Sequence, residues 1–114
     1  MKKVIINFKN INATLQTSQT TNVLERMIGL LNKKQLAENS GIWISPCKQV
    51  HTWFMKFSID AVFVDNKNKV IAIEELKPWK LSKMHWKAAG VIETPFGWSK
   101  KNKLSVGSIF EVKL

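Results

Sequence analysis

Cys47 and His51 are four positions apart, and their side chains are of the types that do nucleophilic chemistry together. If the chain folds back at Pro46, the thiol approaches the imidazole, which then stabilises a thiolate nucleophile. No glycines typical of an oxyanion hole accompany the pair, and a buried free cysteine usually behaves as a small hydrophobic residue. The pair is therefore compatible with a cysteine–histidine enzyme and with an inert core thiol.

Metal binding is a weaker interpretation of the same residues. Cys47 and His51 with one distant carboxylate, Asp60 or Glu93, have the types of zinc ligands, but this spacing is not diagnostic of a zinc site. Because the chain has one cysteine, an internal disulfide, a C-x-x-C redox pair and a four-cysteine zinc site are all excluded. We expect neither a metal ion nor a cofactor.

Three charged residues stand out among apolar neighbours. Arg26 is the one arginine beside 17 lysines, and its planar guanidinium can hold a carboxylate or phosphate at two points. It is predicted either to bind an anionic ligand or to form an internal ion pair with Asp60 or Glu93. Asp60 can instead cap its own turn, and Glu93 lies between Ile92 and Thr94 in a strand-like run.

The segment HTWFMKF (51–57) has the alternating pattern of a strand. That pattern places His51, Trp53, Met55 and Phe57 on one face, with Thr52, Phe54 and Lys56 on the wetter face. Binding pockets are mostly apolar with a few placed polar groups. We therefore predict a binding module for a small polar or anionic molecule, or for a peptide end. The predicted pocket residues are Arg26, His51, Trp53, Met55, Asp60 and Glu93.

The segment KPWKLSKMHWK (77–87) is basic and carries two tryptophans. The whole chain has a net charge of +10. The segment resembles a stacking surface for single-stranded nucleic acid or a membrane interface. The scarcity of arginine argues against nucleic acid, and tryptophans that simply cover one end of a barrel are the ordinary alternative. The residues of this predicted surface are Trp79, Lys80, Lys83, Trp86 and Lys87.

Short strands surround one predicted helix. A helix is expected at 22–31, where apolar residues recur at helical spacing and Asn22 and Glu25 form a variant capping box. One further helical turn is expected within 95–103. We predict a mainly β fold, a single compact domain over 1–114 resembling a β-sandwich or a jelly-roll-like barrel. The predicted strands are 3–8, 11–17, 42–45, 50–57, 60–65, 69–76, 88–94 and 107–114, with 60–65 and 69–76 central.

The N-terminus has two lysines but only a short apolar run, Val4–Ile6, and no small-residue cleavage site. No window approaches the roughly 20 apolar residues of a transmembrane helix. We expect a cytoplasmic protein without a transmembrane segment. The sequence does not indicate an oligomeric state.

The central segment GIWISPCKQVHTWFMKFSIDAVFVD (41–65) resembles the DUF192 family, also called UPF0127. The segments ERMIGLL (25–31), VIETPFGW (91–98) and KLSVGSIFEVKL (103–114) extend the resemblance over nearly the whole chain. It implies a compact, jelly-roll-like β domain and brings no reaction or cofactor. The resemblance also favours a single cluster formed by Arg26, His51, Asp60 and Glu93. It further implies a secretion-related protein partner.

The sequence departs from the family pattern at three positions. Ser108 stands where the family shows aspartate, so a site that used this acid would be altered. Thr94 and Phe96 replace a leucine and a small residue, so a pocket near Pro95–Gly97 is expected to be narrower.

Overall fold

A computed structural model describes residues 2–9, 11–22, 26 and 34–113 of the chain. Its named elements are seven strands and one short helix. They are β1 (Lys2–Phe8), β2 (Ala13–Thr20), β3 (Ser40–Ile44), β4 (Ile59–Val64), β5 (Val70–Leu76), β6 (Gly90–Pro95), α2 (Trp98–Lys101) and β7 (Phe110–Lys113).

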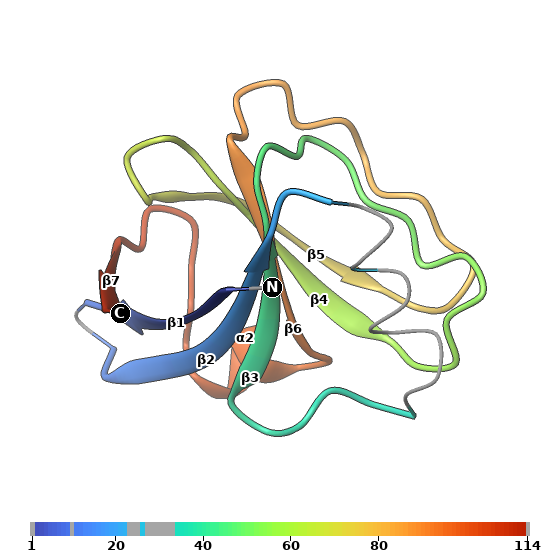
Figure 1. Ribbon diagram of the computed structural model, residues 1–114, viewed down its shortest axis with the longest axis horizontal. Helices are drawn as coiled ribbons and strands as arrows, with labels where there is room; N and C mark the ends of the chain where they lie inside the picture. The colour runs from blue at the N-terminus through green and yellow to red at the C-terminus, as the bar shows by residue number, and fades with distance from the viewer. Residues whose placement is uncertain (1, 10, 23–25, 27–33, 114) are drawn as a thin grey trace.

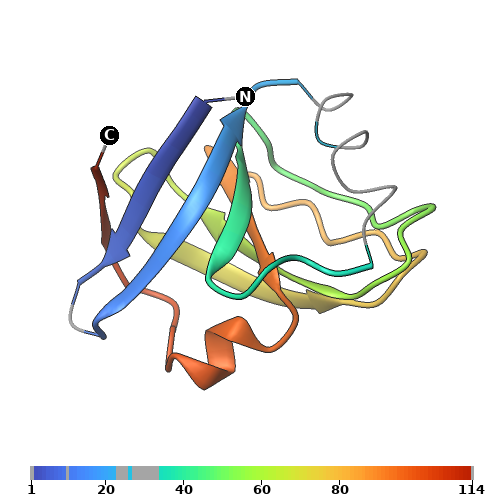
Figure 2. The ribbon, with the colours of Figure 1, turned by 60° about the horizontal axis from the view of Figure 1, so that its bottom comes forward.

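The strands form one sheet in the order β5-β4-β6-β3-β2-β1-β7. All neighbours are antiparallel except β2 and β3, which run parallel. The sheet curls strongly (Figures 1 and 2), so its two edge strands approach each other at one end. There, Lys69 and Ile109 form a bridge, and the Val70 amide donates to the Ser108 carbonyl at 2.8 Å. The result is a half-barrel.

Each face of the curled sheet covers its own hydrophobic core. The inner face gathers side chains from β1, β2 and β4 around Phe8, Phe110 and Trp98. The other face of β3, β4 and β6 packs under the segments 46–58 and 77–89, around Phe63 and Met55. Because β4 is buried along its whole length, its successive residues serve the two cores alternately.

The mainly β prediction is confirmed, and seven of the eight predicted strands are present within a few residues of their expected bounds. The strands predicted at 60–65 and 69–76 pair as an antiparallel hairpin, with the Asp65 carboxylate accepting the Lys67 and Lys69 amides at 2.9 and 3.0 Å. β4 is central as predicted, but β5 is an edge strand. The strand is nevertheless apolar on both faces, because Val70 and Ile73 pack on one hydrophobic core and Ile71 and Ala72 pack on the other.

The predicted strand at 50–57 is wrong. The segment makes one isolated bridge, His51 with Leu81, and then turns at Trp53 and Phe54. Thr52 is fully buried, whereas Phe54 is 58% exposed at a φ of 67°. The predicted alternation of faces therefore fails, because hydrogen bonds from Thr52 to the 77–80 segment outcompete a regular ladder.

The predicted helix at 22–31 lies mostly outside the described residues. Arg26 is described and helical, with its amide donating to the Asn22 carbonyl at 3.2 Å. The helical turn expected within 95–103 is confirmed as α2. Within the described residues, no helix has the length and apolar character needed to cross a bilayer.

Candidate functional site

The centre of the candidate site is a buried ion pair between Arg26 and Glu93. Glu93 lies in the middle of β6 and is completely buried. The Nε of Arg26 donates to Glu93 Oε1 at 2.8 Å, and Nη2 donates to Oε2. Nη2 also contacts the Met55 sulfur at 3.9 Å. Arg26 is only 3% exposed, so the pair neutralises two charges that would otherwise be costly to bury.

A small pit opens above this pair. It has a volume of about 40 Å³ and is lined by Arg26, Ile44, Cys47, Gln49, Val50 and His51. Within the described part of the chain, no hydrogen bond uses Nη1 of Arg26, although this side chain lines the pit. Since one water takes about 30 Å³ of liquid volume, the pit holds a single small polar group.

Cys47 lines the pit as a partly buried thiol. Its sulfur donates to the Gln49 carbonyl at 3.2 Å, and no hydrogen bond joins it to His51 among the described residues. Burial raises the pKa of Cys47, and the nearby Glu93 carboxylate acts in the same direction against the Gln49 hydrogen bond and Arg26. The neutral thiol is therefore favoured, which works against a nucleophilic role.

His51 forms the outer rim of the pit. Its Nδ1 accepts the Trp53 amide at 3.3 Å, so the neutral ring carries its proton on Nε2. The ring stacks on the Trp53 indole, with centroids 4.5 Å apart and planes inclined by 25°. Burial, followed by the charge of Arg26, lowers the pKa of His51. The imidazole is thus a neutral hydrogen-bond donor at neutral pH.

Asp60 does not join this cluster. Glu93 is in register with Ala61 on β4, so Asp60, one residue earlier, faces the opposite side of the sheet. Its carboxylate accepts the Gly97 and Ser99 amides, both at 3.0 Å, and the Ser99 hydroxyl. Asp60 therefore fixes the start of α2, a segment distant in sequence, rather than capping its own turn.

The structure brings together four of the six residues predicted for the pocket. Arg26, His51, Met55 and Glu93 meet on one face of the sheet, with Trp53 stacked outside His51. Sequence reasoning missed Gln49, which lines the pit and whose side-chain amide donates to the Ser82 carbonyl at 2.9 Å. It also missed Ser99, although its position just after Gly97 in a turn is a signal for capping.

The predicted basic–aromatic surface is spread along a segment rather than gathered on one patch. Residues 80–85 run antiparallel to 48–52, joined by main-chain hydrogen bonds. Trp79 packs on Phe54 at one end, whereas Trp86 lies at the other end beside Met84 and Ile71. Lys80, Lys83 and Lys87 are exposed between and beyond them.

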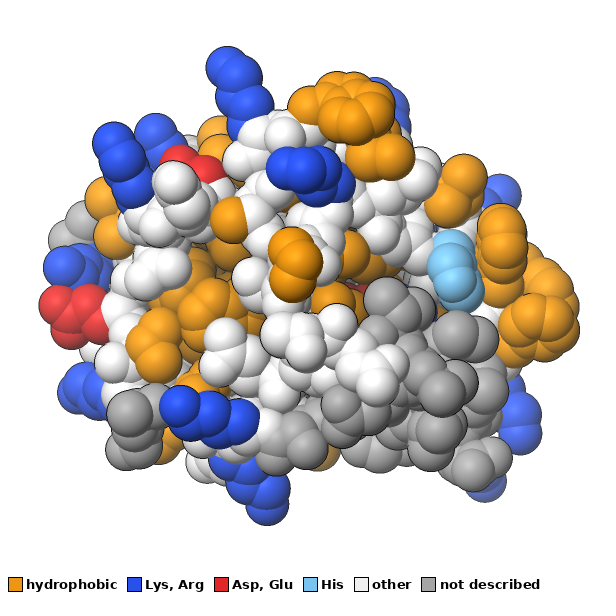
Figure 3. Space-filling model, turned by 45° about the horizontal axis from the view of Figure 1, so that its top comes forward, with side chains coloured by type: hydrophobic (Ala, Val, Ile, Leu, Met, Phe, Trp, Pro, Cys, Tyr) orange, Lys and Arg blue, Asp and Glu red, His pale blue; other side chains and the backbone are white. Residues whose placement is uncertain are grey.

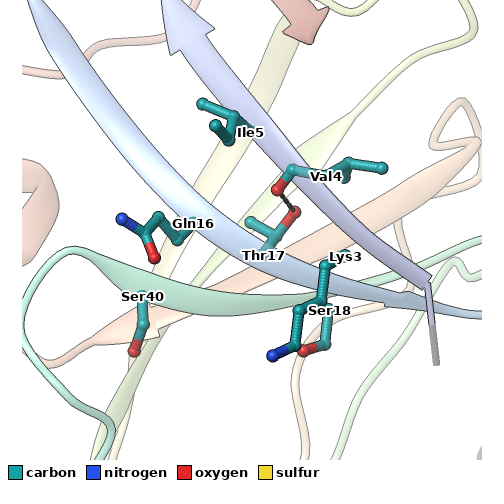
Figure 4. Close-up of a pocket in the computed structure, with 7 residues that line it drawn as sticks. All are labelled: Lys3, Val4, Ile5, Gln16, Thr17, Ser18 and Ser40. Atoms are coloured by element: carbon teal, nitrogen blue, oxygen red, sulfur yellow. Dashed lines mark hydrogen bonds between the residues drawn. The ribbon is translucent and has the colours of Figure 1, made fainter. Parts of the chain in front are cut away.

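A wider depression lies elsewhere on the described surface. It measures about 460 Å³ on the outward face of β1, β2 and the start of β3, where Lys3, Ile5, Gln16, Ser18 and Ser40 project (Figure 4). The one hydrogen bond drawn there joins Thr17 to the Val4 carbonyl at 3.0 Å and belongs to the strand pair itself. With no convergent set of polar groups, this open face is a poor candidate site.

Ser108 lies away from the pit, in the turn before β7, where its hydroxyl accepts the Ser105 amide at 3.3 Å. Phe96 is 49% exposed and borders shallow depressions beside Leu36 and Pro95. None of the three positions that depart from the family pattern, Ser108, Thr94 and Phe96, lines the pit. Among the residues that the structure describes, no three His, Cys, Asp or Glu side chains gather as a metal site.

A family model matches this chain over residues 4–112; the family is DUF192, described as an uncharacterized ACR. Among individual proteins, a UPF0127 protein of Pyrococcus horikoshii is 27% identical over 109 residues, covering 91% of this chain and 93% of that protein. Another, of Pyrococcus abyssi, is 37% identical over 62 residues, and the match spans about half of its length (53%) and 54% of this chain.

Two solved structures share the fold. One, from Sinorhizobium meliloti 1021, superposes with a TM-score of 0.84 at 18% identity, over 97% of this chain and 94% of that one, and is provisionally described as a transcription regulator. A protein of unknown function from Novosphingobium aromaticivorans gives a TM-score of 0.80 at 15% identity, over 96% and 83%. At these identities the likeness concerns the fold alone.

Proposed function

The chain belongs to the DUF192 family, and we propose that it is a binding module that receives the carbonyl or carboxylate end of a ligand in the pit over Arg26 and Glu93. The observation that carries this proposal is a buried guanidinium that, together with His51, lines a small opening. A guanidinium that lines such an opening can donate hydrogen bonds to a carbonyl or carboxylate oxygen placed in it.

The groups around the pit are mainly hydrogen-bond donors. The guanidinium of Arg26 carries N–H donors, and the neutral His51 ring carries one on Nε2. The Cys47 thiol is held neutral by its raised pKa. Such a set is complementary to an acceptor. Because Glu93 already balances the charge of Arg26, an uncharged carbonyl is accommodated as well as a carboxylate.

The size of the pit restricts what enters it. About 40 Å³ accepts one terminal group but not a whole metabolite, since drug-sized ligands occupy pockets of roughly 300–1,000 Å³. The remainder of the ligand must lie outside, along the rim. There the 43%-exposed Trp53, stacked on His51, offers an apolar surface. A peptide end with an apolar side chain fits both features.

The test compares three N-acetylated dipeptides ending in leucine: the free acid, the C-terminal amide and the reduced alcohol. Binding is measured by NMR shifts of the Trp53 indole and the His51 ring. We expect the acid and amide to bind, the alcohol to bind at least tenfold more weakly, and His51→Ala to weaken the first two. Asp60→Asn, which changes a carboxylate on the other face of the sheet, is the matched control.

Equal binding of all three dipeptides, or binding indifferent to His51→Ala, would overturn the proposal. A cysteine–histidine enzyme is less well supported, because the thiol is paired with the Gln49 carbonyl and its pKa is raised. One fold neighbour is provisionally described as a transcription regulator. Nucleic-acid binding by this chain is less well supported, because its one arginine is buried in an ion pair.

A further inference from the structure

We propose that a second site, the aromatic tip formed by Phe54 and Trp79, docks the protein onto the surface of an anionic phospholipid bilayer. The inference is independent of the pit and of the ligand proposed for it. It rests on the strained backbone of the tip, on the buried residue that holds it, and on the charge around it.

Both tip residues adopt a backbone conformation that bulky side chains avoid. The φ of Phe54 is 67° and that of Trp79 is 64°, in the left-handed region where a large non-glycine residue is an outlier. Neither ring gains burial in return, because Phe54 is 58% and Trp79 61% exposed. The rings touch each other, with centroids 4.7 Å apart and planes at 57°. Strain that persists without burial commonly marks a functional position.

One buried residue holds the two turns together. Thr52 is completely buried. Its hydroxyl donates to the Lys77 carbonyl at 2.6 Å and accepts the Lys80 amide at 2.9 Å, while its own carbonyl accepts the Trp79 amide at 3.0 Å and the Met55 amide at 3.1 Å. The fold thus uses a core threonine to fix the direction in which Phe54 and Trp79 project.

The tip continues into a wider apolar surface. Leu81 and Trp53 lie beside it and are 55% and 43% exposed, whereas Met84 and Trp86 lie at the far end of the same segment. Figure 3 shows hydrophobic side chains projecting at this end of the molecule beside a histidine. Contiguous exposed apolar side chains of this kind mark interaction surfaces.

The charge around the tip is of one sign. The segments 46–58 and 77–89 contain no aspartate or glutamate. The adjacent Glu74 is engaged by the His85 ring at 2.6 Å and the Lys83 amide. The lysines of these two segments are all exposed, and they are Lys48, Lys56, Lys77, Lys80, Lys83 and Lys87.

A bilayer suits this surface better than a nucleic acid does. Tryptophan, phenylalanine and leucine with flanking lysines are the composition of interfacial membrane segments, and each lysine near an anionic surface strengthens binding about fivefold. Stacking of bases needs open ring faces along a groove. Phe54 and Trp79 instead contact each other at a tilt of 57°, and Trp86 lies at the far end of its segment. No arginine takes part, since Arg26 is buried.

The experiment measures cosedimentation with phosphatidylcholine vesicles, with and without phosphatidylserine, at low and physiological salt. We expect binding only with phosphatidylserine, weakened by salt. Phe54→Asn/Trp79→Asn is expected to reduce binding at least tenfold without lowering the melting temperature, because asparagine tolerates positive φ. Its control is Val106→Asn, which alters a 64%-exposed residue outside both segments.

The electrostatic arm uses Lys77→Gln/Lys80→Gln, expected to weaken binding by roughly tenfold or more. Lys67→Gln/Lys113→Gln removes the same charge elsewhere and is expected to have a smaller effect. The proposal is overturned if wild type does not bind phosphatidylserine vesicles at low salt, or if the asparagine variant binds as wild type does. Tip-dependent binding of single-stranded oligonucleotide without vesicle binding would also overturn it, in favour of nucleic acid.

Discussion

Arg26 and Glu93 are 67 positions apart in the sequence, yet they form a two-point ion pair in the core, with side chains 4% and 0% exposed. The pair links Arg26 to the centre of the sheet, and Arg26 also lines the pit. Because Arg26 therefore serves both the core and the proposed binding site, its two contributions must be measured with different variants.

Breaking this pair from one side should be strongly destabilising. Arg26→Met leaves a buried carboxylate without its partner, and we expect a loss of about 3–5 kcal/mol in the free energy of unfolding. The double variant Arg26→Met/Glu93→Leu should recover much of that loss, because no charge remains buried. Urea denaturation checks both. Lys101→Met, which breaks the exposed pair of Lys101 with Glu38, should change little; equal losses in the two single variants would contradict the argument.

Asp60→Asn should cost stability without affecting the pit. The replacement cannot accept all three hydrogen bonds from Gly97 and Ser99, and a buried unpaired donor costs about 1–3 kcal/mol. Thermal denaturation measures the loss. Asp65→Asn is the comparison, since Asp65 also accepts two amides but in an exposed turn where water can replace it. Impaired dipeptide binding in Asp60→Asn would place this residue in the site after all.

His51 should make the protein less stable in mild acid. Burial and Arg26 lower the pKa of His51 in the folded state, so the unfolded chain binds more protons below about pH 6.5. The contribution of His51 to the free energy of unfolding is therefore fully present above that pH, and it is lost as the pH drops through the lowered pKa. NMR titration of the ring should show the lowered midpoint. His51→Gln should flatten this part of the pH–stability curve, whereas His85→Gln should leave the contribution in place.

Cys47 should react slowly with iodoacetamide at neutral pH. Burial raises the pKa of Cys47, so little thiolate is present to react. Mass spectrometry of the native and urea-denatured protein should show labelling that accelerates on unfolding. Since no hydrogen bond joins the sulfur to His51, His51→Ala should leave the rate unchanged. Fast native labelling that His51→Ala slows would instead support a cysteine–histidine enzyme.

Local pattern was sufficient for most strands and for the family. The hairpin at 60–76 follows from two apolar runs around Asn-Lys-Asn, and its turn is closed by Asp65 within the same few residues. Likewise, 77–87 was not among the predicted strands, and it forms no named strand. Such features depend on neighbours in sequence, which is why they could be predicted.

The site depended on contacts that no local pattern contains. Asp60 and Glu93 looked equivalent as partners for Arg26, and only the register of β4 with β6 places them on opposite faces. The alternation at 50–57 favoured a strand, but Thr52 takes its hydrogen bonds from a segment 25 to 28 positions later. By itself, then, the sequence determined the β-rich class, the hairpins and the family. The tertiary structure decided which polar side chains meet, because burial forces each of them to find a partner wherever the curled sheet brings one within reach.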